Sequence, residues 1–266
     1  MNSIKIQSGA SINVIVLDIT PQTWLKAGAD ALQSVIGSVA GYCRSLLLMN
    51  SAAEVAVIAA YPGAADFIWT SSSPAPSSAP VQTKGSTRFF PYSTETRVVD
   101  KDAAVSFVSY TDDKTFSATS ELEERLRESI SKLGSSLMAG EKAKSPFPSL
   151  DIALSKALCF INRKRVDFDT LAKNINVFLS SPVEARVLCV CASQDCSTQY
   201  VPFMNAVFAA QKDKVPIDTC FLKMVSQPSV YLKNASYITE NSVYLENEST
   251  EGLLQLMIVN KRNKKK

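Results

Sequence analysis

The residues best suited to chemistry follow the first buried run of the chain, where the sequence reads Asp18-Ile19-Thr20-Pro21-Gln22. A carboxylate and a hydroxyl two residues apart on such a turn can both point at one oxygen-coordinated cation, and Mg²⁺ takes ligands of this kind. Asp195, just beyond a later apolar run, supplies a further carboxylate. Asp18, Thr20 and Asp195 are therefore the candidate metal ligands. In the alternative interpretation, Asp18 and Thr20 hydrogen-bond to each other and stabilise the turn without a metal.

Other kinds of chemistry are excluded by what the sequence lacks. The chain contains no histidine, which excludes Ser-His-Asp and Cys-His catalytic sites and HExxH zinc sites. None of its six cysteines forms a Cys-x-x-Cys pair, so no zinc is expected in this chain. It also has no phosphate loop and no GxGxxG motif. We expect no enzymatic activity and no cofactor, with Mg²⁺ as the alternative. A hydrolase that uses Asp18 and Asp195 stays open, although no nucleophile motif accompanies them.

Buried strands and amphipathic helices alternate along the chain. Apolar runs typical of strands occur at 12–17, 55–61, 67–69, 186–192, 215–222 and 243–245. Helical spacing of apolar residues occurs at 27–49, 121–137, 149–161, 204–211, 231–237 and 251–259. This alternation predicts an α/β fold, with a mostly parallel central sheet and helices on both faces. Ligands of such sheets bind at the carboxyl ends of the strands, where Asp18 and Asp195 are expected to lie.

Two short segments connect or follow these elements in ways that affect the interpretation. Residues 20–24 are expected to break the first strand. Arg163-Lys164-Arg165 comes after a helix that is predicted to end near Ile161, where cations suit the negative end of the helix dipole. This explanation of the basic triplet requires no nucleic acid.

Composition divides the chain into one domain at 1–260 and a basic tail at 261–266. Eight of the ten residues from Ser71 to Pro80 are Ser or Pro, which predicts a flexible insertion at 71–87 inside the domain. Five of the 28 basic residues lie in the tail, which leaves 23 against 25 acidic residues in the domain. A sequence-specific DNA-binding face is therefore not expected. The tail fits nuclear localisation, a weak nucleic-acid contact or solubilisation. No apolar run reaches the roughly 18 residues that span a membrane, so no membrane partner is expected.

Several motifs resemble a known family. Asp18-x-Thr20 resembles the start of the Asp-x-Ser-x-Ser metal site of von Willebrand factor A domains, although Gln22 departs from the pattern at the third position. The most distinctive block is Gln199–Lys212, supported by Leu154–Ile161, Pro216-Ile217-Asp218 and Ala235-x-x-Ile238-Thr239. Together they resemble the thirty-four-kilodalton subunit of the general transcription factor IIH core. The resemblance covers residues 11–69 and 148–257.

The sequence departs from this family in two places. Members of the family usually continue into a zinc-binding module rich in Cys and His, and no such cysteines follow here. We expect either that the lineage lost the module or that the chain is shortened. Glu240-Asn241-Ser242 stands where the family tends to have a glycine turn.

The resemblance implies a von Willebrand factor A (Rossmann-like) fold and a non-catalytic structural role in the transcription factor IIH core complex. That role supports initiation by RNA polymerase II and nucleotide excision repair in the nucleus, through protein–protein contacts. The implied partners are a sister core subunit with a RING-like zinc module and the other core subunits. The alternative is a metal-dependent ligand-binding protein of the same fold outside transcription factor IIH, which needs a cation at Asp18 and Thr20.

The block Gln199–Lys212 is the candidate partner surface. Its polar side chains at Gln199, Asn205, Gln211 and Lys212 are candidates for contacts with a partner, although a solvated helix face explains them as well. Phe203 and Phe208 lie near them in the sequence and are predicted to pack against the sheet.

Overall fold

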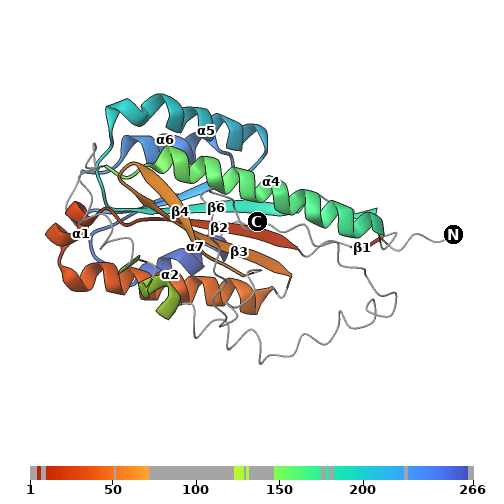
Figure 1. The fold of residues 1–266 in the computed structure, drawn as a ribbon, viewed down its shortest axis with the longest axis horizontal. Coiled ribbons are helices and arrows are strands. Elements are labelled where there is room, and N and C mark those ends of the chain that lie inside the picture. The colour runs from red at the N-terminus through yellow and green to blue at the C-terminus, as the bar shows by residue number, and fades with distance from the viewer. Residues whose placement is uncertain are drawn as a thin grey trace, which may run out of the picture.

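A six-stranded sheet forms the centre of the molecule (Figure 1). The computed structural model describes residues 5–6, 10–50, 52–71, 123–128, 130–131, 147–174, 178–179, 183–224 and 227–262. The strands run in the order β4-β3-β2-β6-β7-β8. Their bounds are β2 Ser11–Asp18, β3 Ala53–Tyr61, β4 Ala64–Thr70, β6 Glu184–Cys191, β7 Ile217–Leu222 and β8 Tyr244–Asn247. Two short strands, β1 (Lys5–Ile6) and β5 (Phe178–Leu179), pair with each other outside this sheet.

The sheet is parallel except at one edge, where β4 runs antiparallel to β3. Strand β2 lies between β3 and β6, with Val14 opposite Ala56 and Val187. Its residues from Ile12 to Asp18 are all buried, as expected for a strand covered on both faces. Because β2 and β6 are parallel neighbours, the turn after Asp18 and the loop after Cys191 begin at the same edge of the sheet.

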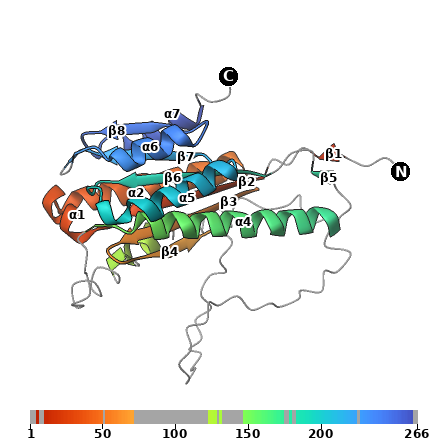
Figure 2. The same cartoon turned by 90° about the horizontal axis from the view of Figure 1, so that it is seen from above.

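Helices cover both faces of the sheet, as the alternation of elements predicts. Helices α4 (Leu150–Asn174), α5 (Tyr200–Lys212) and α6 (Val230–Ile238) lie on one face, and α2 (Ala29–Met49) and α7 (Leu253–Arg262) lie on the other (Figure 1). Figure 2 shows α5 between α4 and α6. Helix α1 (Pro21–Ala27) joins the end of β2 to α2, and a 3₁₀ turn, η2 (Ser197–Gln199), leads into α5.

The apolar core is divided by the sheet into two clusters. Val14, Ile58 and Phe203 belong to the cluster under α4, α5 and α6. Ile15 and Val57 point the other way and pack with Trp24 in the cluster under α2 and α7. The alternating direction of strand side chains thus distributes the apolar residues of β2 and β3 to both faces.

The first strand does end before residues 20–24, as expected, but helix α1 in this segment is not predicted. Pro21 occupies the first turn, where its missing N–H costs nothing and its fixed φ suits a helix. Gly28 separates α1 from α2 with a φ of 104°, which a residue with a side chain rarely adopts. Trp24 is buried under this turn.

The predicted end of α4 near Ile161 is wrong, because the helix continues to Asn174. The basic triplet 163–165 therefore lies within the helix and does not complement its C-terminus. Lys164 pairs with Glu54 at 3.4 Å. Arg165 donates to the backbone oxygen of Asp213 at 3.2 Å, just beyond the last residue of α5. The cation thus serves the C-terminal end of a neighbouring helix.

Several predicted segments lie partly or wholly outside the described residues. The Ser/Pro-rich insertion does so from residue 72 onward, and the basic tail does so from residue 263 onward. Lys261 and Arg262 form the end of α7. The helix predicted at 121–137 is helical at 123–128 and 130–131, where Leu126 and Ile130 are buried beside α2.

One described helix, between Asp30 and Met49 in α2, is long and apolar enough to cross a membrane by length and composition. Val35, Val39 and Leu46 of this helix are fully buried in the cluster on its side of the sheet. Its apolar face is therefore explained by the packing of a core helix.

Candidate functional site

The carboxylate of Asp18 lies at the carboxyl end of β2 and is completely buried. One oxygen, Oδ1, accepts hydrogen bonds from the backbone N of Thr20 at 2.9 Å and from its hydroxyl at 2.6 Å. The other, Oδ2, accepts from the backbone N of Ser193 at 2.9 Å and of Ala192 at 3.2 Å. Asp18 therefore ties its own turn to the loop that follows β6.

A fifth donor to Asp18 is the thiol of Cys191, whose Sγ lies 3.4 Å from Oδ2. Burial raises the pKa of this thiol well above its usual value, and the nearby charge of Asp18 raises it further. Cys191 therefore stays protonated and able to donate at neutral pH. Both oxygens of the carboxylate are then engaged by protein donors.

The turn after β2 is closed by two further hydrogen bonds. The hydroxyls of Thr23 and Ser193 lie 2.7 Å apart, and both residues are buried. The indole Nε1 of Trp24 donates to the backbone oxygen of Asp18 at 2.9 Å. Gln22, the residue at the third position of the metal-site pattern, is exposed on α1. Thr23 and Ser193, together with Asp18 and Thr20, form what we call the Asp18 lock.

Asp195 is not directed toward the Asp18 lock. Its carboxylate accepts hydrogen bonds from the hydroxyl of Ser229 and from the backbone N of Val230 at 2.8 Å and Tyr231 at 3.2 Å. These donors form the start of α6, where a negative charge suits the helix dipole. Asp195 thus holds the first turn of α6 against the loop after β6.

The donor set at the carboxyl edge does not fit a magnesium site. Mg²⁺ requires near-octahedral coordination by oxygen, usually with one or two carboxylates free to bind it. Here Asp18 is engaged by five donors, and Asp195 is engaged at α6. Within the described residues, no group of three or more His, Cys, Asp or Glu side chains could hold a metal ion.

Three of the four candidate partner residues lie on α5. Asn205, Gln211 and Lys212 are exposed, whereas Gln199 is half-buried in η2, directly before the helix. The prediction that both aromatic side chains pack against the sheet is correct for Phe203 and wrong for Phe208, which is 51% exposed. Five residues at 100° each place Phe208 about 140° around the helix from Phe203, on the outer side.

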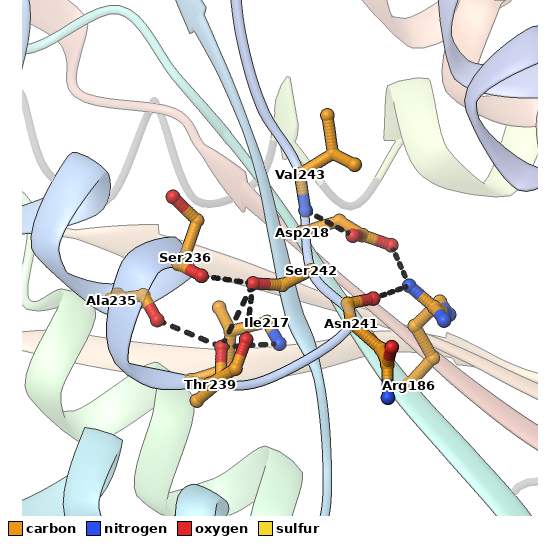
Figure 3. Close-up of polar contacts among 9 residues, drawn as sticks. All are labelled: Arg186, Ile217, Asp218, Ala235, Ser236, Thr239, Asn241, Ser242 and Val243. Atoms are coloured by element: carbon orange, nitrogen blue, oxygen red, sulfur yellow. Dashed lines mark hydrogen bonds and ion pairs between the residues drawn. The ribbon is translucent and has the colours of Figure 1, made fainter. Parts of the chain in front are cut away.

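A second polar cluster lies at the opposite edge of the sheet, where β6 and β7 begin (Figure 3). Arg186 pairs with Asp218 at 2.6 Å and also donates to the backbone oxygen of Asn241 at 3.2 Å. Asp218 accepts from the backbone N of Val243 at 2.8 Å. These contacts fasten the connection between α6 and β8 to the two central strands, and we call them the Arg186–Asp218 clamp.

Figure 3 also shows the turn that follows α6, where the sequence departs from the family pattern. Thr239 donates to the backbone oxygen of Ala235 at 2.7 Å and accepts from the backbone N of Ile217 at 3.1 Å (Figure 3). Asn241, two residues later, has a φ of 61°. Glycine adopts this left-handed conformation without strain, and Asn is among the few other residues that adopt it readily. Asn241 therefore adopts, with little strain, a conformation that a glycine turn would supply.

Four residues in these two clusters are missed by reasoning from sequence: Thr23, Arg186, Ser193 and Asp218. Thr23 lies within the turn motif, so its spacing could have been noticed. Arg186 stands at the start of the apolar run 186–192 and Asp218 lies inside the run 215–222, and neither position indicates a partner. Only the pairing of β6 with β7 brings them together.

The chain is similar in sequence to known proteins. The family model described as Transcription factor Tfb4 matches residues 10–265. The protein named General transcription and DNA repair factor IIH subunit TFB4 of Debaryomyces hansenii is 27% identical over 279 residues, covering 93% of this chain and 68% of that protein. Its namesake in Arabidopsis thaliana is 35% identical over 140 residues, covering 51% of this chain and 41% of that protein.

Among solved structures, the crystal structure of the TFIIH p34 N-terminal domain superimposes with a TM-score of 0.65. It is 21% identical in sequence, and the match covers 93% of this chain and 96% of that one. This similarity concerns the fold, and it confirms the predicted α/β architecture. The family resemblance seen in the sequence motifs is confirmed by the family model. The chain belongs to the transcription factor Tfb4 family.

Proposed function

We propose that this chain is a non-catalytic structural subunit of general transcription factor IIH. The relatives it matches are named as transcription and DNA repair factor IIH subunits. The main support for a structural role is the hydrogen bonding at the carboxyl edge of the sheet. Ligands of this fold class bind at that edge, and here the Asp18 lock fills it with the protein's own hydrogen bonds.

The described side chains support a role without catalysis. Burial raises the pKa of the Cys189 and Cys220 thiols to about 12, so neither is a nucleophile at neutral pH. We infer that the chain supports initiation by RNA polymerase II and nucleotide excision repair in the nucleus. It does so by holding other subunits in place.

We also propose that Asp18, Thr20 and Asp195 act without a bound metal. The alternative function, a metal-dependent ligand-binding protein outside transcription factor IIH, requires Asp18 and Thr20 to face a cation. The five donors around Asp18 speak against that alternative. No zinc and no other cofactor belong to this proposal.

The proposed partners are a sister core subunit with a RING-like zinc module and the other core subunits. The exposed polar residues of α5, Asn205, Gln211 and Lys212, with Gln199 before them, are the proposed contacts. Neither sequence-specific DNA contact nor membrane binding is part of the proposed role.

The test is affinity purification of the tagged chain from cells of its own species, followed by mass spectrometry. We expect the transcription factor IIH core subunits, including the sister with the RING-like module, at near-equal stoichiometry. Recovery of the chain alone, or with unrelated proteins, would overturn the proposed function. A variant with substitutions on the surface of α5 would test the contact surface and not the membership of the complex, so it does not serve as the control. An unrelated tagged nuclear protein is the suitable control.

A further inference from the structure

The outer side of α5 carries one continuous stripe of exposed residues. Val201, Asn205, Phe208 and Lys212 follow one another at spacings of four, three and four residues. These spacings place all four side chains on one face of the helix. We call them the α5 stripe. Val201 is 65% exposed and Phe208 is 51% exposed.

The exposure of Phe208 is not required by the packing of α5. The inner side of the helix is already filled by Phe203, Val207 and Ala210, all of which are buried. Helix α5 also lies between α4 and α6, so its outer side is the middle of this face of the molecule (Figures 1 and 2). A large aromatic side chain at such a central, exposed position is typical of a residue that anchors a protein–protein contact.

The charged residues of α5 and α6 are lysines. Neither α5 nor α6 contains an acidic residue, and both carry an exposed lysine, Lys212 and Lys233. Lys214, also exposed, follows α5 directly. Asp213, between Lys212 and Lys214, accepts a hydrogen bond from the side chain of Asn162 of α4 at 3.5 Å. Helix α4 carries exposed charges of both signs, at Arg163, Asp167 and Asp169. A protein that covers α5 and α6 therefore matches their lysines best with carboxylates beside an apolar surface.

We propose that the α5 stripe is the surface on which another subunit of transcription factor IIH docks, with an apolar pocket for Phe208 and an acidic group opposite Lys212. This inference rests on the proposed function and names the surface that carries it out. Phe208 contributes apolar area that is buried in the contact. Lys212 contributes specificity for the partner and for its orientation. Asn205, between Val201 and Phe208 on the stripe, contributes a hydrogen bond to the contact.

The test compares two variants of the stripe with matched variants on the other face of the sheet. Phe208→Asp and Lys212→Glu change the stripe. Leu48→Asp, at the exposed end of α2, and Lys26→Glu, on α1, change residues of the same kind elsewhere. Each tagged full-length chain is purified from its own cells, and the recovered core subunits are quantified against the tagged chain.

We expect Phe208→Asp to recover the core subunits at least tenfold less well than the unchanged chain. Lys212→Glu should lower the recovery severalfold and make the remainder more sensitive to salt. Leu48→Asp and Lys26→Glu should recover them normally. Thermal melting of each purified chain shows whether the variants fold. If Phe208→Asp does not fold, Phe208→Ser and Lys212→Glu carry the test.

The outcomes separate the surface from the function. If the unchanged chain recovers the core subunits and the folded stripe variants recover them equally well, the inference about α5 is wrong and the proposed function stands. If Leu48→Asp loses them and Phe208→Asp keeps them, the docking face is the opposite one. If the unchanged chain recovers no core subunit, the proposed function fails, and the proposed surface fails with it.

Discussion

Two buried aspartates at opposite edges of the same sheet are held in different ways. At the carboxyl edge, Asp18 accepts hydrogen bonds from neutral groups of its own turn and of the loop after β6. At the amino edge, Asp218 has the guanidinium of Arg186 at 2.6 Å. The loops that follow parallel strands present backbone N–H groups to their edge, so a carboxylate can be held there without a cation. Where the strands begin, this chain uses an arginine.

The difference also determines how much each cluster contributes to the free energy of unfolding. Asp18 has no contact with water, whereas the side chains of Arg186 and Asp218 are 23% and 9% exposed. Water screens a partly exposed ion pair and can replace part of its hydrogen bonding. The donors around Asp18 have no such replacement. Loss of Asp18 is therefore expected to cost more than loss of Asp218.

The largest expected effect is that of Asp18→Ala, which leaves the buried N–H groups of Thr20, Ala192 and Ser193 without an acceptor. We expect it to lower the free energy of unfolding by about 3–5 kcal/mol, measured by urea denaturation. Asp18→Asn keeps one acceptor oxygen and should lose about half as much. Equal stability of Asp18→Ala and the unchanged chain would show that the Asp18 lock is not structural.

A smaller effect is expected for the Arg186–Asp218 clamp. Asp218→Ala should lower the free energy of unfolding by about 2 kcal/mol, because it removes the ion pair of Arg186 and leaves the backbone N of Val243 without its acceptor. A double-mutant cycle with Arg186→Met measures the coupling between the two side chains, which we expect at about 1 kcal/mol. A loss for Asp218→Ala larger than that for Asp18→Ala would reverse the comparison.

Within the Asp18 lock, the Thr23–Ser193 hydrogen bond is expected to contribute about 1 kcal/mol. Thr23→Val removes the hydroxyl at nearly constant shape and should lower the free energy of unfolding by that amount. Ser193→Ala should cost about the same. The double variant should cost less than the sum, because the same hydrogen bond is lost in each. Strict additivity would mean that the two hydroxyls do not interact.

The smallest effect is expected at Asn241, in the amino-edge turn. Asn241→Gly should leave the stability unchanged or raise it by a few tenths of a kcal/mol, because glycine accepts a φ of 61° without strain. Asn241→Val should lower it by about 1 kcal/mol or more, since a β-branched residue is strained there. Thermal melting of both variants checks the pair. Similar melting temperatures for Val and Gly would contradict the left-handed backbone at this position.

Thiol labelling gives an independent check on the buried strands. Burial raises the pKa of Cys43, Cys189 and Cys220 to about 12, so their reactive thiolate is scarce at pH 8. Cys159 is exposed. In the native protein, we expect iodoacetamide to modify Cys159 rapidly and the three buried thiols only after unfolding, as read by mass spectrometry. Rapid native labelling of Cys189 would contradict the position of β6.

Much of the fold can be predicted because the signals are long and local. The apolar run at 12–17 and the helical spacing at 27–49 predict β2 and α2 within a few residues. The end of α4 is missed because charged residues after Ile161 form helix as readily as they end one. Helix α1 is missed because Pro21 correctly indicates the end of a strand, and the first turn of a helix accepts proline equally well.

The candidate site divides in the same way. The alternative to metal binding predicts a hydrogen bond between Asp18 and Thr20, and the structure contains this bond. It could be predicted because the two residues lie close together in the sequence. The other donors, Ala192 and Ser193, come from a loop more than 170 positions away. The prediction for Phe208 is wrong because its spacing of five residues from Phe203 places it on the outer side of the helix, not on the face that packs against the sheet.

The most direct test of a structural, metal-free carboxyl edge is the melting temperature of the chain with and without magnesium. A bound ion stabilises the folded state in proportion to RT ln(1 + [Mg²⁺]/Kd). We predict the same melting temperature, within about 1 °C, in 10 mM MgCl₂ and in EDTA with NaCl at matched ionic strength. A rise of several degrees in MgCl₂ that disappears in Asp18→Asn would contradict the account and make Asp18 a metal ligand.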